Sequence, residues 1–320
     1  MKKILSAPMA GFTNFAFREL LRFFGGVDVI ETEMVSARSF VELELRSFDY
    51  PSRLWGVCGE SGVTVQIWDN SSDTLSEFAG RLVNDFHVSG IDLNFGCPAR
   101  QIAGKSASGS YLLRFPERIG DIVSCVVKSA AGIPVTAKIR LGCTLDTINA
   151  IDVAQAVEAA QADGIIVHGR TAAEMYRGNA NWNEIAKIKP KLKKINLYGN
   201  GDIKTVNDAI EKLQNYPVDG IMIGRAALAK PWIFSQIKAA TQKLQIPKDP
   251  SNAELNRIIK IHYELLKKQL NTQSAINQLR KHICHYTANK TNSRQLRNNI
   301  CKTNNINEIF NIIDNFLKNE

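Results

Sequence analysis

The sequence of 320 residues has no long uninterrupted run of apolar side chains and no pair of closely spaced cysteines. A membrane-spanning helix needs about 20 consecutive apolar residues, so the sequence predicts no membrane span. The 6 cysteines show neither a Cys-x-x-Cys pair nor a zinc-like spacing, and we therefore expect no disulfide framework and no metal site. Such cysteines fit a reducing compartment, which indicates a cytoplasmic protein.

A targeting segment is not expected at the N-terminus either. Met1, Lys2 and Lys3 give the charged start of a signal peptide, but Pro8 and Gly11 interrupt the hydrophobic core that such a peptide needs. The chain is long enough for one barrel domain of roughly 250 residues and an appendage. Its apolar share of 44% is sufficient to bury a full core.

Short apolar segments recur along the chain, and each ends in a polar or glycine-rich cluster. We expect strands at residues 4–8, 27–31, 63–67, 91–95, 135–139, 165–168, 195–198 and 220–223. Segments of helical period lie between most of them, for example Leu75, Phe78 and Leu82. Alternating strands and helices predict a parallel sheet, and eight repeats predict the α/β class and a closed (β/α)8 TIM barrel.

The pattern changes after the last strand. Residues 246–252 form an expected linker, with a helix N-cap at Ser251 or Asn252, and no strand signal follows. Leu279, Ile283 and Tyr286 lie on one stripe of a helix. The predicted organisation is a catalytic barrel over residues 1–245 and a small all-α domain over residues 253–320.

The net charge of +9 is unevenly distributed. Residues 251–320 hold 11 Lys and Arg against 5 Asp and Glu, whereas residues 1–250 hold 29 against 26. The imbalance suggests that the helical tail binds a polyanion, although a solvated helical face in a lysine-rich chain gives the same pattern.

The stretch Asn94-Phe95-Gly96-Cys97-Pro98 is the most informative part of the chain. It brings a thiol to the end of an apolar strand, just before a rigid proline. The active sites of such barrels lie at the carboxyl ends of the strands, so Cys97 is a candidate for chemistry. A small buried residue in a loop is the competing interpretation.

Other strand ends also carry polar or small residues. The first strand ends in Ala7-Pro8-Met9-Ala10-Gly11, which lets a flat ligand lie against the backbone. Gln66 ends the third strand, Lys138 and Arg140 the fifth, and His168 the sixth. Each has an ordinary structural explanation by itself, and their shared position favours a site.

Glycine-rich ends follow the seventh and eighth strands. Gly199-Asn200-Gly201-Asp202 precedes a helix expected to begin near Ile203, and Gly224-Arg225 precedes another short helix. Loops in this position, with exposed backbone N–H groups, bind phosphate in such barrels. Together with Gln66 and Lys138 at a heterocycle edge, they suggest bound FMN.

The chain resembles the bacterial tRNA-dihydrouridine synthases. The resemblance rests on the first-strand motif, on residues 92–98 and 137–140, on Val167-His168-Gly169-Arg170-Thr171, on Asn200-Gly201-Asp202, and on residues 220–225. Residues 176–178 and Leu279-Arg280-Lys281-His282 also match the family. The sequence departs from the family at residues 104–110, where further glycines are more usual.

The resemblance implies an FMN-dependent enzyme that reduces the C5–C6 bond of uridine in tRNA with NADPH or NADH. Cys97 would be the catalytic acid, since a thiol with a pKa near ~8.5 stays protonated at neutral pH. Asn94 and Arg140 would bind the substrate, with Asn94 at the uracil edge, and Lys138 and Arg140 would offset negative charge on the reduced flavin or the developing enolate. The implied FMN ligands are Pro8, Met9, Ala10, Gln66, Lys138, His168, Asn200, Gly201, Asp202, Gly224 and Arg225.

The tail would hold the tRNA through Arg280, Lys281, Arg294 and Arg297, while the target base leaves its stack to reach the barrel. No protein partner is implied, and we expect a monomer without a metal. The preference for NADPH over NADH rests on the family alone.

Three other interpretations stay open at this point. A flavin barrel could act on a free pyrimidine, with the tail as an oligomer contact. A lyase could form a Schiff base at Lys138 and need no flavin. A non-enzymatic RNA-binding protein would leave Cys97 without a purpose.

Overall fold

The computed structural model describes residues 1–44, 52–60 and 62–319. These residues form two compact units. The first unit comprises residues 1–10 and 27–224, and the second comprises residues 11–26 and 225–320.

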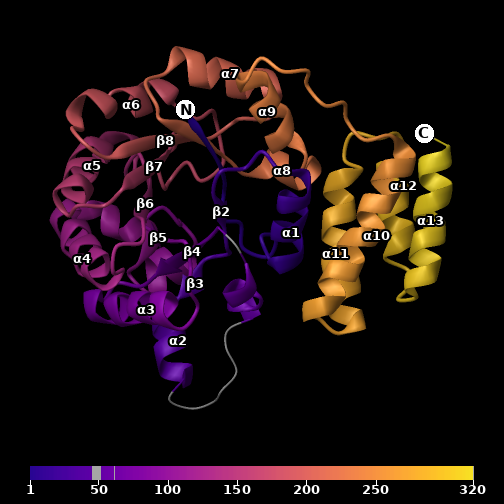
Figure 1. Ribbon diagram of the computed structural model, residues 1–320, viewed down its shortest axis with the longest axis horizontal. Helices are drawn as coiled ribbons and strands as arrows, with labels where there is room; N and C mark the ends of the chain where they lie inside the picture. The colour runs from indigo at the N-terminus through magenta and orange to yellow at the C-terminus, as the bar shows by residue number, and fades with distance from the viewer. Residues whose placement is uncertain (45–51, 61, 320) are drawn as a thin grey trace. The chain divides into compact units, whose positions relative to one another are not determined.

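The first unit is built on parallel strands that follow one another around a barrel (Figure 1). The strands are β1 (Lys3–Ser6), β2 (Ile30–Glu31), β3 (Val35–Ser36), β4 (Val63–Trp68), β5 (Gly90–Asn94), β6 (Val135–Arg140), β7 (Gly164–His168), β8 (Asn196–Asn200) and β9 (Gly220–Ile223). They pair in the order β1-β9-β8-β7-β6-β5-β4-β2, and β3 adds a short pairing to β4. A parallel bridge between Leu5 and Val29 brings the first two strands together. The expected (β/α)8 barrel is confirmed, with every expected strand present.

Helices of the first unit alternate with these strands and ring the barrel in Figure 1. They are α2 (Ala37–Glu44), α3 (Ser72–Asn84), α4 (Pro116–Ser129), α5 (Ala150–Ala159), α6 (Trp182–Ala186) and α7 (Val206–Asn215). In α3 the Ser71 side chain accepts a hydrogen bond from Thr74 N at 3.3 Å, which satisfies a donor at the helix start. Leu75, Phe78 and Leu82 recur at helical spacing and are buried.

The barrel interior is apolar on one side and polar on the other. Leu5, Ala7, Ile166, Tyr198 and Met222 form its apolar cluster. Successive side chains of a strand point to opposite faces, so every second residue of β4, β5 and β6 faces this interior. These positions carry polar side chains and form the site described below.

The second unit is entirely helical within its described residues. It contains α1 (Phe15–Phe24), α8 (Arg225–Ala229), α9 (Ile233–Thr241), α10 (Asn252–Gln269), α11 (Thr272–Tyr286), α12 (Ser293–Ile300) and α13 (Ile306–Lys318). Ser251 caps α10, and its backbone N–H donates to Glu254 Oε2 at 2.7 Å. This capping box confirms Ser251 as the expected N-cap.

The compact units do not divide the chain at the expected linker. Ala16 and Leu20 of α1 and Trp232 before α9 belong to the same apolar core as Leu279 and Ile283 of α11. The apolar face of α1 and the side chain of Trp232 are buried in the core of the tail helices, which places them in that unit. The domain boundary at residues 246–252 stays a prediction, and residues 244–251 contain neither helix nor strand.

Candidate active site

A ladder of buried hydrogen bonds joins three adjacent strands inside the barrel. Gln66 Nε2 on β4 donates to Asp92 Oδ2 on β5 at 2.7 Å, and Asn94 Nδ2 donates to Gln66 Oε1 at 2.8 Å. Thr136 Oγ1 on β6 donates to the other oxygen of Asp92 at 2.6 Å. Gln66 keeps a further N–H and lone pair with which it can bind a ligand, whereas the second N–H of Asn94 donates to Met34 Sδ at 3.6 Å.

Asp92 and Glu31 are buried carboxyl groups that the sequence analysis did not single out. Burial raises the pKa of Asp92 to about 6, although the hydrogen bonds from Gln66 and Thr136 act in the opposite direction. Burial also raises the pKa of Glu31 well above its ordinary value, and Asp92 raises it further. The only available signal was an acidic residue within an apolar strand, because a buried charge needs a partner or a proton.

Lys138 is the cation of this interior. Its ammonium group donates to Asn200 Oδ1 at 3.2 Å, and Asn200 Nδ2 donates to Met222 O at 2.8 Å. Burial lowers the pKa of Lys138 to about 8, with Glu31 and Asp92 acting in the opposite direction. The structure therefore brings together Lys138 of β6 and Asn200 of β8, two strands separated by β7, as expected of strand ends at one face of a barrel.

The loop that carries Cys97 is tied to the ends of β5 and β6. Asn94 Oδ1 accepts hydrogen bonds from the backbone N–H groups of Gly96 at 3.2 Å and Cys97 at 2.9 Å. Arg140 Nε donates to Gly96 O at 2.9 Å, and Ser110 N donates to Cys97 O at 3.0 Å. The position of the thiol is thus set by contacts on both sides of the loop.

The surroundings of Cys97 favour its protonated form. Burial raises the pKa of the Cys97 thiol, while the Ala99 backbone N–H and the charges of Arg140 and Lys138 act to lower it. The side chain is only half-buried. A thiol with a raised pKa holds its proton at neutral pH and can give it to an acceptor.

Arg140 is largely engaged with the protein backbone. Besides Gly96, its guanidinium donates to Thr171 O at 2.9 Å and Met175 O at 2.8 Å, and it lies 5.6 Å from the ring centre of Tyr176. These bonds join the loops after β5 and β7. The observed contacts of Arg140 position loops, and its expected contact with the uracil stays a prediction.

Arg170 plays a similar part beside His168 and was missing from the expected site residues. It donates to Asp202 Oδ2 at 2.7 Å and Gly178 O at 2.6 Å, and it lies 3.3 Å from His168 Nε2. Asp202 also accepts a hydrogen bond from Ala180 N at 2.7 Å. Arg170 and Asp202 therefore hold the loop after β7 against the end of β8. The arginine of the His-Gly-Arg-Thr motif was the signal that could have identified this role.

The expected phosphate loops differ in one respect from the sequence prediction. The helix after β8 begins at Val206, so the expected start near Ile203 is wrong. Thr205 and Asp208 form a capping box that holds the start of α7 three residues later. The first backbone N–H groups of α7 are therefore paired with side chains of the helix start. The backbone N–H groups around Gly201 and Gly224 remain as candidates to donate hydrogen bonds to a phosphate.

Gly201 and Gly224 differ in whether the fold itself requires a glycine at that position. A Cβ on Gly201, whose φ is +126°, would come within 2.6 Å of Ala180 Cβ, so the fold itself requires glycine there. A Cβ on Gly224 would meet Ala7 Cβ at 3.4 Å and Met9 Sδ at 3.6 Å, which are ordinary contacts. Packing within the protein therefore does not require a glycine at position 224. A ligand that lies close to the backbone there would require one.

The remaining expected ligands lie at two places in the chain. Pro8 and Met9 are half-buried and Ala10 is exposed, just after β1. Arg225 is exposed and is the first residue of α8 in the helical unit.

Among the described residues no cluster of histidine, cysteine or carboxylate side chains could hold a metal ion. No described helix is both long enough and apolar enough to cross a membrane.

The four basic residues expected to bind tRNA lie on α11 and α12 and differ in their surroundings. Lys281 and Arg294 are exposed, and Arg297 is half-buried. Arg280 instead donates to Ile300 O at 3.0 Å, to Thr303 O, and to two asparagine side chains. These bonds satisfy carbonyl groups at the end of α12, as a basic residue at a helix C-terminus does.

Comparisons with known proteins agree with this arrangement. Residues 5–319 match the family described as Dihydrouridine synthase (Dus). Proteins named "Probable tRNA-dihydrouridine synthase" include one from Mycobacterium tuberculosis (strain CDC 1551 / Oshkosh), 33% identical over 88% of this chain and 74% of that protein. Another, from Rickettsia conorii, is 34% identical over 92% of this chain and 87% of that protein.

A solved structure described as TcOYE with pHBA shows the same fold at low sequence identity. It aligns with a TM-score of 0.51 and 11% identity, over 77% of this chain and 90% of that chain. At this identity the likeness concerns the barrel fold alone.

Proposed function

Because the chain belongs to the dihydrouridine synthase family of flavin oxidoreductases, we propose that it reduces the C5–C6 double bond of uridine in tRNA with FMN as cofactor. NADPH, or NADH, would be the transient reductant. The observation that carries this proposal is the half-buried Cys97 thiol, with its raised pKa, at the carboxyl end of the barrel strands.

The groups of the barrel interior fit FMN. Gln66 offers an oriented amide with one further N–H and lone pair for the edge of a heterocycle, and Lys138 offers a positive charge in the same interior. Gly224 has room for a side chain within the protein, which supports a cofactor lying against its backbone. We retain Pro8, Met9, Ala10, His168, Asn200, Gly201, Asp202 and Arg225 as further proposed ligands.

When bound, reduced FMN would supply a hydride to C6 of the uracil. Cys97 would give the proton from its Sγ to C5, and solvent would return a proton to the thiol. A carboxyl group with an ordinary pKa would already be ionised at neutral pH and could not serve as the acid. The raised pKa of Cys97 therefore suits this step.

Lys138 and Asn94 would assist without changing covalently. The ammonium group of Lys138 would offset negative charge that develops on the cofactor or on the uracil oxygen. Asn94 holds the Cys97 backbone through its Oδ1. Asn94 stays a proposed contact of the uracil edge, and Arg140 would hold the loop in place.

The helical unit would bind the tRNA backbone. Lys281, Arg294 and Arg297 lie on α11 and α12, within the part of the sequence that carries the excess positive charge. Contacts to phosphate supply much of the affinity for nucleic acid and need no base recognition. Arg280 stays a predicted contact. We further propose that the enzyme works as a cytoplasmic monomer, where tRNA is available.

The other interpretations are less well supported. A Schiff-base lyase would profit from the lowered pKa of Lys138, but membership of a flavin oxidoreductase family argues against it. A reductase of free pyrimidines would have no use for the basic helices.

The direct test is the conversion of unmodified tRNA by the purified, FMN-loaded protein with NADPH. Nucleoside mass spectrometry should detect one or more dihydrouridines, and the same tRNA incubated without NADPH is the control. A flavin-loaded protein that reduces free uridine and leaves tRNA unchanged would contradict the proposal.

A further inference from the structure

The loop after β5 folds back on itself around Cys97. It contains the short helical segment η3 (Arg100–Lys105) and returns at Ser110, whose backbone N–H donates to Cys97 O at 3.0 Å. Gly109, with φ at +57°, permits this close return, because a Cβ there would lie 2.7 Å from the Cys97 carbonyl oxygen. The returning end of the loop is therefore attached to the Cys97 backbone.

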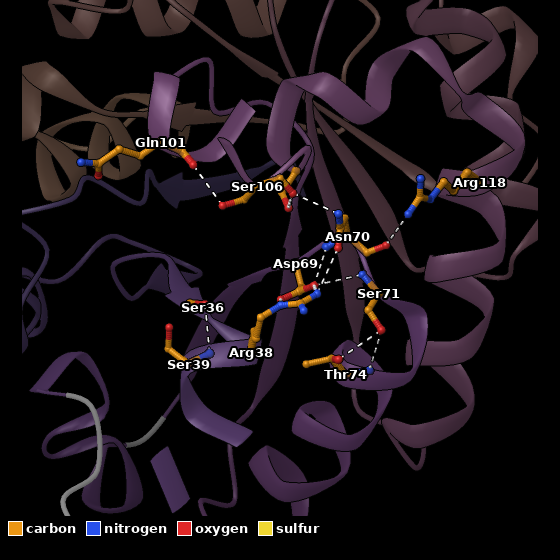
Figure 2. A network of polar contacts seen from close by, with 11 residues as sticks. Ser36, Arg38, Ser39, Asp69, Asn70, Ser71, Thr74, Gln101, Ser106 and Arg118 are labelled. Carbon is orange, nitrogen blue, oxygen red and sulfur yellow. Dashed lines mark hydrogen bonds and ion pairs between the residues drawn. The ribbon is translucent and has the colours of Figure 1, made fainter. Parts of the chain in front are cut away.

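The side chain of Asn70, in the turn after β4, contacts the far side of this loop. Asn70 Nδ2 donates to Ser106 O at 3.0 Å, and Ser106 Oγ donates to Gln101 O at 3.0 Å within the loop (Figure 2). Ser108 Oγ also donates to Ser106 O, at 2.9 Å. Ser106 directly follows η3 and precedes the return at Ser110.

Asn70 is itself held on every side (Figure 2). Its backbone N–H donates to Asp69 Oδ1 at 2.7 Å, and its side-chain oxygen accepts from Arg38 Nη2 at 3.2 Å. Arg38 Nη2 also donates to Asp69 Oδ1 at 2.9 Å, and Arg118 Nη2 donates to Asn70 O at 2.8 Å. The amide of Asn70 is thus locked with its donor toward Ser106.

The stabilising effect of this network is expected to be small. The Asp69 side chain is buried, at 3% exposure, but that of Arg38 is 53% exposed, and ion pairs with such exposed partners contribute little to stability. Its geometric effect is larger, since it connects the end of the strand that carries Gln66 to the loop that carries Cys97.

We propose that Asn70 is a positioning residue, held by Arg38 and Asp69, which sets the location of the Cys97 thiol through Ser106. The inference rests on the proposed role of Cys97 as the proton donor. Proton transfer needs close approach of donor and acceptor, and a misplacement of about 1 Å can cost on the order of 100-fold in rate. Asn70 acts through the loop and does not touch the substrate.

The test uses the FMN-loaded full-length chain with Asn70→Asp. This change keeps an acceptor for Arg38 but removes the donor to Ser106 and puts a carboxylate against its carbonyl oxygen. Ser71→Ala is the matched control, because it removes the neighbouring helix cap at Thr74 and leaves the Asn70 contacts unchanged. Arg38→Gln is the second variant, to be used if Asn70→Asp fails to fold.

Two readouts separate positioning from general damage. The first is the turnover number on tRNA, together with KM and the rate of flavin reduction by NADPH. The second is the alkylation rate of Cys97 by iodoacetamide, resolved by peptide mass spectrometry, with the exposed Cys301 as internal reference.

We expect Asn70→Asp to lower the turnover number on tRNA roughly 10-fold or more, with KM and flavin reduction nearly unchanged. Alkylation of Cys97 should change several-fold while that of Cys301 stays constant. Ser71→Ala should alter neither readout. Parent-like turnover and parent-like alkylation of Cys97 in Asn70→Asp would overturn the inference. If the parent itself were inactive on tRNA, the proposed function would fail, and the alkylation readout would still decide whether Asn70 positions the loop.

Discussion

The side-chain oxygen of Asn94 accepts a hydrogen bond from the backbone N–H of Cys97 at 2.9 Å. The same Asn94 donates to Gln66 across the barrel interior. A residue on a rigid strand therefore joins the group proposed to bind FMN and the thiol proposed to protonate the substrate. This connection gives the site a fixed geometry, which proton transfer requires.

Replacement of Cys97 by alanine should separate proton transfer from cofactor binding. Cys97→Ala should bind FMN and be reduced by NADPH at the parent rate, because the thiol has no proposed role in either step. Turnover on tRNA should fall by roughly 100-fold or more, as expected for loss of a general acid. Cys125→Ala, which removes another half-buried thiol from α4, is the control. Reduction of tRNA by Cys97→Ala at the parent rate would show that the thiol only fills space.

Lys138 should influence the reduction potential of the bound flavin. Lys138→Met should lower that potential at about pH 7, because it removes a positive charge that stabilises the reduced, negatively charged form. Since burial lowers the pKa of Lys138 to about 8, the difference between parent and variant should shrink as the pH rises through that value. Lys138→Arg stays charged over this pH range, so its flavin potential should remain above that of Lys138→Met at both pH values.

The measurement is a spectroelectrochemical titration of the three FMN-loaded proteins at about pH 7 and about pH 9.5. Equal potentials for the parent and Lys138→Met at the lower pH would contradict a role for the charge.

The helical unit should lose stability in acid because of two buried histidines. Neither ring nitrogen of His282 has a hydrogen-bond partner among the described residues, and its ring stacks on Phe17 at 5.4 Å. Burial lowers the pKa of His262 to about 3 and that of His282 well below its ordinary value. The folded state therefore excludes protons that the unfolded chain accepts.

The sign follows from this difference in proton binding. The stability that depends on these neutral histidines is fully present above the unfolded pKa of about 6.5. It is lost as the pH falls from there toward about 3. At about pH 5 His262 lowers the free energy of unfolding by about 2 kcal/mol relative to neutral pH. His282→Phe removes the second titrating group, and we expect it to make the loss of stability on acidification smaller.

Urea denaturation at about pH 7.5 and about pH 5, followed by circular dichroism, measures this effect. Carboxyl groups titrate in the same range but are common to parent and variant. His87→Asn is the control, because His87 is an exposed histidine of the barrel with φ at +52°, which asparagine tolerates. An unchanged pH dependence in His282→Phe would refute the assignment.

Salt dependence should identify the residues that bind tRNA phosphate. Replacing Lys281, Arg294 and Arg297 with alanine should reduce the slope of log affinity against log salt by a few units, because fewer counterions are released. Lys268→Ala, an exposed lysine of α10, should leave the slope nearly unchanged. Equal slopes for the parent and the triple variant would show that these side chains do not meet the tRNA.

Arg280 needs a separate experiment, since its hydrogen bonds to Ile300 and Thr303 support the fold of α12. A loss of tRNA binding in Arg280→Ala would therefore combine two causes. A truncation near Lys248 has the same weakness, because it would expose Leu20 and Trp232 of the shared helical core.

The sequence by itself determined the class of fold and the strand ends at which the candidate site lies. Strands and helices follow from local apolar periodicity, and parallel strands carry their carboxyl ends to one face of a barrel. For this reason Cys97, Gln66 and Lys138 could be assigned to one region from their positions after apolar segments. The motifs around Cys97 and His168 were sufficient to identify the family.

Only the tertiary structure decided which partner each polar side chain has. Asp92 and Glu31 are acidic residues in otherwise largely apolar strand segments, and their burial becomes visible only when the barrel is assembled. The bonds of Arg140 to Gly96 and Thr171, like that of Asn70 to Ser106, join residues far apart in the chain. Periodicity and spacing describe neighbours along the sequence, whereas such contacts depend on how loops from different strands meet.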